Sequence, residues 1–125
     1  MIAVDTSTLI AFLKGEKGND VEELDSCLES RIIVLPPPVL TEILSDPRLP
    51  STLTETLLDL PLLEINEGFW ERAGLTRSKI LSKSLKCRIA DSIIAQSCID
   101  NSVPLITRDK DFRHFEKYTK LNVIW

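Results

Sequence analysis

The sequence has 125 residues, 43% hydrophobic and 27% charged, which is long enough for one compact domain with a core and short for two. With 19 acidic and 15 basic residues the net charge is −4, so the chain has no overall electrostatic footprint for nucleic acid. It has no apolar run long enough to span a bilayer, and its start, MIAVD, is typical of a core strand rather than a signal peptide, so we expect a cytoplasmic single domain over residues 1–125 without a membrane segment.

Cysteine and histidine are too few and too scattered for several common kinds of site. Cys27, Cys87 and Cys98 are odd in number and have no CxxC spacing, which argues against a disulfide framework and a zinc knuckle. His114 has no second histidine or cysteine nearby, so a zinc site or a Ser-His-Asp triad would depend on one residue. Any metal site should therefore be built from oxygen ligands.

The first half of the chain alternates short apolar runs with amphipathic segments. Short β-branched runs such as RIIVL are typical of buried parallel strands, and apolar residues three or four apart are typical of helices. In chain order we predict a strand over residues 2–4, helices over 8–14 and 21–29, a strand over 31–35, and helices over 39–46 and 53–60.

The second half continues the alternation. We predict, in order, a strand over residues 62–65, a long helix from 66 or 67 to 81 or 85, a helix over 88–100, a strand over 103–107, a charged loop over 108–115 and an edge strand over 121–125. Strands alternating with helices favour right-handed crossovers and helices on both faces of the sheet. The predicted fold is therefore an α/β/α sandwich around a central, mostly parallel sheet of about five strands.

Four isolated acids are predicted to meet at one edge of this sheet. Asp5 ends the first strand, and Asp109 follows the fourth by two residues. Glu42 and Asp91 lie early in crossover helices, whose N-termini reach the same edge because these helices run antiparallel to the strands. Crowded carboxylates need a compensating cation, and a set of oxygen ligands selects Mg²⁺ or Mn²⁺. One or two such ions can activate water for in-line attack on a phosphodiester.

The predicted site has a central set of ligands and a supporting set. Asp5 and Asp91 are the central metal ligands, joined by Asp109, and Glu42 binds directly or through water. Asp111 is a further candidate, although Phe112 beside it suggests that Asp111 caps the local turn. Four nearby hydroxyls are predicted to orient water molecules: Thr6, Ser7, Ser92 and Thr107.

Basic residues are concentrated close to the predicted site. Residues 72–88 hold six basic residues and no acid, and a second basic group follows the strand over 103–107. Such a run is either a solvated helix face or a surface that contacts phosphate groups. On the second interpretation, the contacting residues are Lys79, Lys83, Lys86, Arg88 and Arg108.

The ordered set of segments VDTSTLI, VLTEIL, RIADSIIAQSC and LITRDKDF resembles the PIN-domain nucleases and, among them, the VapC-type toxins of toxin–antitoxin pairs. The resemblance covers essentially the whole chain. It implies an Mg²⁺- or Mn²⁺-dependent endoribonuclease that acts on RNA, forms a homodimer and is inhibited by a small antitoxin in the active-site groove. It also implies catalytic roles for four acids: Asp5, Glu42, Asp91 and Asp109. The compact segment after Leu49 and the acidic composition depart from the family pattern and leave the RNA target open.

Three other functions share parts of this pattern. A phosphatase of the haloacid dehalogenase type needs a second aspartate two residues after Asp5, where Ser7 stands. A receiver domain needs a phosphoacceptor aspartate at the end of the third strand, where LLEIN has none. A catalytically silent PIN-like module would use the same pocket only to bind RNA or a partner protein, and this alternative stays open beside the nuclease.

Overall fold

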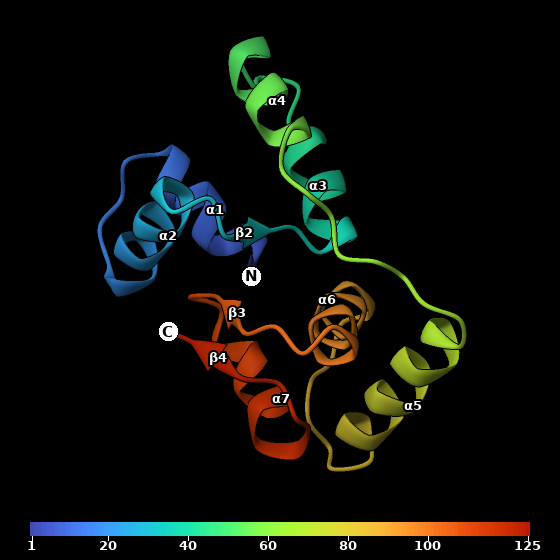
Figure 1. Cartoon of the computed structure of the whole chain (residues 1–125). Coiled ribbons are helices and arrows are strands. Elements are labelled where there is room, and N and C mark those ends of the chain that lie inside the picture. Colours follow the sequence, from blue (N-terminus) through green and yellow to red (C-terminus); the bar gives the residue numbers. More distant parts are fainter.

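A parallel sheet of four short strands forms the centre of the computed structural model, which describes residues 1–125 (Figure 1). The strands follow the order β2-β1-β3-β4, and every pair is parallel. Their bounds are β1 (Ile2–Val4), β2 (Ile33–Val34), β3 (Leu105–Ile106) and β4 (Val123–Ile124). Ala3 pairs with both Val34 and Leu105, so β1 is an inner strand. The predicted α/β fold with a parallel sheet is confirmed.

The predicted strand over residues 62–65 does not join the sheet. It contributes one isolated bridge, between Leu35 and Leu62, so the sheet has four strands rather than about five. Leu62 and Ile65 remain exposed, and only Leu63 is buried. A strand that buries a single side chain gains too little apolar burial to fix an extended segment.

Seven α-helices surround the sheet, and six of them lie within a few residues of the predicted ranges. Their bounds are α1 (Thr6–Leu13), α2 (Asn19–Glu29), α3 (Pro37–Leu44), α4 (Ser51–Leu58), α5 (Phe69–Leu81), α6 (Ile89–Asp100) and α7 (Arg113–Tyr118). None of these helices is long and apolar enough to cross a membrane.

Residues 110–115 of the predicted charged loop over 108–115 are helical, which corrects that prediction. A 3₁₀ turn, η1 (Lys110–Phe112), leads directly into α7. Phe112 and Phe115 are both buried, and their rings lie 5.8 Å apart between centroids. Two aromatic side chains three residues apart can enter the core together only when the backbone between them is helical.

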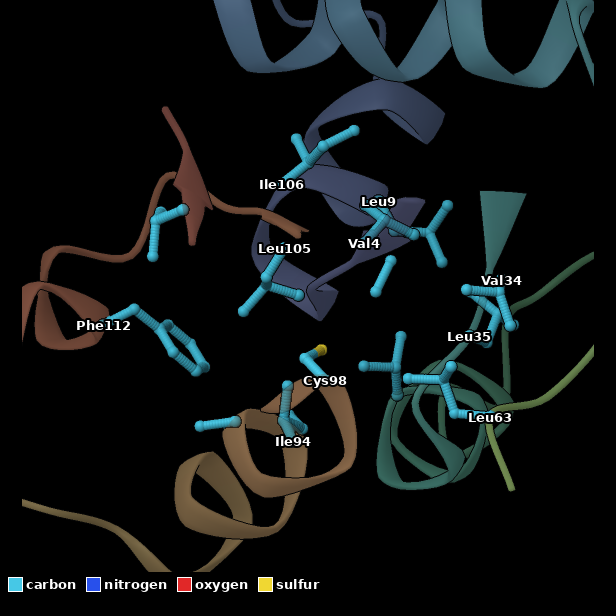
Figure 2. Close-up of a cluster of buried hydrophobic side chains, with 14 of the residues drawn as sticks. Val4, Leu9, Val34, Leu35, Leu63, Ile94, Cys98, Leu105, Ile106 and Phe112 are labelled. Atoms are coloured by element: carbon cyan, nitrogen blue, oxygen red, sulfur yellow. The ribbon is translucent and has the colours of Figure 1, made fainter. Parts of the chain in front are cut away.

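The core between the sheet and α6 holds the strand ends in place. Ile94 and Cys98 lie one helical turn apart on α6 and are buried, as are Val4 and Leu105 on the strands. Figure 2 shows Leu105 on the α6 side of the sheet, and Ile106 on the side of α1. Burying one large apolar side chain stabilises the fold by about 2 kcal/mol, so the carboxyl ends of β1 and β3 are rigidly positioned.

Candidate metal centre

Three carboxylates come together beyond the carboxyl end of β3. Asp91 lies in the first turn of α6, Asp109 is the N-cap residue of η1, and Asp111 lies within η1. One oxygen from each carboxylate lies within 4.8 Å of the other two. All three side chains are only partly buried, so they remain reachable from solvent. An all-oxygen donor set of this size fits a hard divalent cation.

The turn after β3 is fixed by hydrogen bonds from side chain to backbone. The N–H of Asp111 donates to Oδ1 of Asp109 at 2.9 Å, and the N–H of Asp109 donates to Oγ1 of Thr107 at 3.0 Å. Asp109 therefore caps the turn, and the prediction that Asp111 does so is wrong. Asp111 instead faces the cluster, where Lys86 Nζ lies 3.5 Å from its Oδ2.

Asp5 lies buried at the carboxyl end of β1, next to these three acids but outside their group. Its Oδ2 accepts the hydroxyls of Ser7 at 2.8 Å and Thr107 at 3.0 Å, and all its side-chain hydrogen bonds go to this oxygen. Burial raises the pKa of Asp5, and the hydrogen bonds from Ser7 and Thr107 oppose that effect. The three acids that lie closest together thus include Asp111, whereas we predicted Asp5 as the third member of this group.

The acidic group carries more negative charge than its surroundings balance. Desolvation, followed by the charges of Asp109 and Asp5, raises the pKa of Asp91 from 3.8 to about 7. Arg88, at the N-cap position of α6, opposes this shift only in part. Asp91 therefore titrates near neutral pH, and a bound divalent cation would stabilise the charged form that burial and the neighbouring carboxylates disfavour.

Glu42 faces the Asp5 side of the centre from α3. Partial burial raises the pKa of Glu42, the Thr6 hydroxyl lowers it, and the charge of Asp5 raises it further. The Thr6 hydroxyl is buried and makes no hydrogen bond of ordinary geometry, so Glu42 is the polar group it faces. The structure thus places Glu42 beside Asp5, outside the group formed by Asp91, Asp109 and Asp111.

The predicted hydroxyls divide into two sets. Ser7 and Thr107 both bond to Asp5, and their oxygens lie 3.3 Å from each other. Ser92 is buried and donates to the Ile89 carbonyl of its own helix at 2.7 Å, so its proton is not available to orient a water molecule. The structure does not support the role predicted for Ser92.

Arg108 anchors the fold instead of facing the acidic group. Its guanidinium donates to the two carboxylate oxygens of Asp20 at 2.7 and 3.0 Å and to the Lys17 carbonyl at 3.1 Å. Asp20 also accepts the Thr8 hydroxyl at 2.8 Å, and its carboxylate is buried. Because its guanidinium is bound to these groups, the structure does not support the phosphate contact that we predicted for Arg108. Sequence alone did not reveal Asp20 as its partner, since 88 residues separate the two.

Comparisons with known proteins agree with this architecture. The PIN domain family model matches residues 2–118. FitAcB from Neisseria gonorrhoeae is similar with a TM-score of 0.75 at 20% identity, over 100% of this chain and 97% of that chain. VapBC2 from Rickettsia felis, solved bound to a DNA fragment from its promoter, has a TM-score of 0.72 at 19% identity, over 100% and 99% of the chains.

A third solved structure is VapBC-5 from Mycobacterium tuberculosis, a member of the VapBC family of toxin–antitoxin systems. Its TM-score is 0.66 at 18% identity, over 98% of this chain and 96% of that chain. No curated protein sequence matches the chain. At these identities the solved structures show a shared fold, and the family model supplies the assignment. Because that model covers residues 2–118, the chain belongs to the PIN domain family.

Proposed function

We propose that this protein is an Mg²⁺- or Mn²⁺-dependent endoribonuclease and the toxin of a toxin–antitoxin pair. One observation carries the proposal: Asp91, Asp109 and Asp111 place carboxylate oxygens within 4.8 Å of one another beside the buried Asp5, in a PIN-family chain. Three clustered carboxylates with a pKa near 7 among them favour a resident cation. RNA as the substrate would place the protein in the cytoplasm.

Different acids of the chain would bind the metal ion and accept the proton at such a site. Asp91, Asp109 and Asp111 would hold the ion, and the free Oδ1 of Asp5 would add a further ligand or bind a water molecule. When bound, a hard divalent ion supplies an activated water and neutralises charge on the attacked phosphodiester. Glu42, whose pKa is raised, is suited to accept a proton at its carboxylate.

The basic run supports RNA as the substrate class. Lys86 lies next to Asp111, and Arg88 lies close enough to Asp91 to lower its pKa. Lys79 and Lys83 are exposed on the same run, between Arg72 and Lys86. An RNA strand at the metal centre would therefore meet cations that offset the repulsion between its phosphates and the acidic group.

An apolar groove beside the metal centre supports a protein partner. Glu42 lines this groove together with Ile65, Trp70, Ala90 and Ile93, and Trp70 is 62% exposed. We propose that a small antitoxin covers the groove and blocks access to Glu42. The exposed Leu75 on α5 is consistent with a homodimer contact on that helix.

Cleavage of structured RNAs by the purified protein tests the proposal. We expect internal cleavage with Mg²⁺ or Mn²⁺ that stops on addition of EDTA and is lost in the Asp5→Asn and Asp91→Asn variants. Asp46→Asn is the matched control, because Asp46 is an acid paired with Arg48 outside the site. Cleavage that is indifferent to EDTA or to Asp5→Asn would contradict the proposal. Metal-independent RNA binding without cleavage would instead support the catalytically silent module.

A further inference from the structure

Three lysines surround Tyr118, the last residue of α7. Lys83 Nζ lies 4.5 Å from the centroid of the Tyr118 ring, and Lys117 Nζ lies 5.3 Å from it. Lys79 Nζ donates to the Tyr118 carbonyl at 2.7 Å. We propose that this tyrosine–lysine cluster (Lys79, Lys83, Lys117 and Tyr118) binds the phosphates of an RNA strand that runs on from the metal centre. The inference rests on the proposed function, since RNA is its proposed substrate.

The three ammonium groups of the tyrosine–lysine cluster are not neutralised by any carboxylate. All four salt bridges of the protein involve other cations, and Glu116, the acid next to Lys117, forms none with the cluster. The three lysines are exposed, in a chain whose net charge is −4. An acidic chain thus concentrates unpaired positive charge at one point on its surface.

Contacts within the protein fix the positions of these lysines but do not use all of their hydrogen-bond donors. Lys79 and Lys117 lie in the last turns of α5 and α7, where the negative end of each helix attracts a cation. The Tyr118 ring attracts Lys83 and Lys117 through its π face. These contacts hold the side chains in place but leave donor groups of each ammonium facing solvent. A polyanion would use these donors and remove the repulsion between the three charges.

The tyrosine–lysine cluster lies close to the metal centre along the chain and in space. Lys86, which lies 3.5 Å from Asp111, follows Lys83 by three residues. Asp111 and Tyr118 are joined by η1 and α7, and seven residues of helix span about 10 Å. The ends of α5 and α7 lie in the same part of the molecule (Figure 1).

The ammonium groups of the three lysines limit the contacts of this subsite with RNA to phosphate groups. An ammonium group is a point charge without the planar fork that reads base edges, so the cluster binds phosphate in any sequence context. The expected contribution is to affinity and to the path of the strand, with no selection of the cleavage motif. An acidic protein segment is the competing occupant, and the experiment below separates the two.

The test compares two double variants with the same change in charge. Lys83→Gln with Lys117→Gln removes two cations of the cluster, and Lys14→Gln with Lys17→Gln removes two exposed cations of the α1–α2 region. Binding of a fluorescent 12-nucleotide RNA is followed by anisotropy in EDTA, between 50 and 200 mM KCl. Thermal melting checks that each variant is folded.

We expect the cluster variant to lower the slope of log affinity against log salt by about 1.4, since each single-strand phosphate contact contributes about 0.7. Between 50 and 200 mM KCl, its loss of affinity should be about sevenfold smaller than that of the wild type. The Lys14 and Lys17 control should keep the wild-type slope. Equal slopes in the cluster and control variants would overturn the inference.

Three further outcomes separate this subsite from the alternative explanations. Because binding is measured in EDTA, an RNA-cleaving protein whose slope does not respond to the cluster variant refutes the subsite but not the nuclease. A protein that never cleaves but shows the expected slope change supports the subsite without the proposed activity. A poly-glutamate peptide that binds more tightly than RNA, and loses binding in the cluster variant, would assign the cluster to a protein partner and overturn the proposal.

Discussion

The Asp91→Asn substitution tests the electrostatic cost of gathering these carboxylates at the candidate metal centre. The folded protein holds the pKa of Asp91 at about 7, mainly because burial and then Asp109 disfavour its charge, whereas the ordinary value is 3.8. Between these two values the folded state binds a proton that the unfolded chain has lost. The contribution of Asp91 to stability therefore declines as pH rises from about 4 to 7 and stays at its lowest above pH 7.

The size of this effect follows from the interval between the two pKa values. From 3.8 to about 7, at 1.36 kcal/mol per pH unit, the full cost is about 4 kcal/mol. Asp91 is only half-buried, and solvent screening reduces the cost to about 2 kcal/mol. Asparagine is neutral and of similar size, so the variant should be more stable than wild type by about 2 kcal/mol at pH 8 and equally stable at pH 4.

Urea unfolding in EDTA at pH 4, 6 and 8 measures the difference. Without EDTA, free Mg²⁺ at 100 times its dissociation constant should stabilise the wild type by about 2.7 kcal/mol and the Asp91→Asn variant by less. Asp46→Asn is the control with the opposite sign, because the Arg48 backbone N–H lowers the pKa of Asp46 and the variant should lose stability at pH 8. A loss of stability in Asp91→Asn at pH 8, or the same change at every pH, would refute the reasoning.

Three further predictions address the fold and the ligand set. Arg108→Ala leaves the buried Asp20 without its cation, and urea unfolding should show a loss of about 2 kcal/mol in the free energy of unfolding. This loss is smaller than is usual for a broken buried ion pair, because the Arg108 side chain is 32% exposed. Ile94→Ala should cost about 3 kcal/mol in the same assay, independent of pH, by opening a cavity under the sheet. Asp111→Asn should weaken Mn²⁺ binding at least tenfold in calorimetry, whereas Ser92→Ala should leave it unchanged; equal effects would contradict the ligand set described above.

Local pattern was sufficient for most elements of the fold and for part of the centre. The apolar run at Ile2–Val4 and the helical spacing before Cys98 determine their elements because each depends on neighbours within one or two turns. Helix polarity relative to the strands was enough to bring Asp91 and Asp109 to one edge. The segment over residues 62–65 had the composition of a strand, but pattern alone does not reveal whether a partner strand buries its side chains.

The sequence by itself thus determined the parallel α/β architecture and the edge at which the acids collect. Only the tertiary structure decided which acids lie close enough to one another to hold a cation, because the hydrogen bonds of each carboxylate fix the direction in which it points. The hydroxyls of Ser7 and Thr107 donate to the Asp5 carboxylate and fix its direction. The carboxylate of Asp109 caps the turn after β3, which leaves the Asp111 carboxylate free to face the other acids. The pKa of Asp91 was equally beyond the sequence, since it depends on burial and on charges from segments that only the fold brings together.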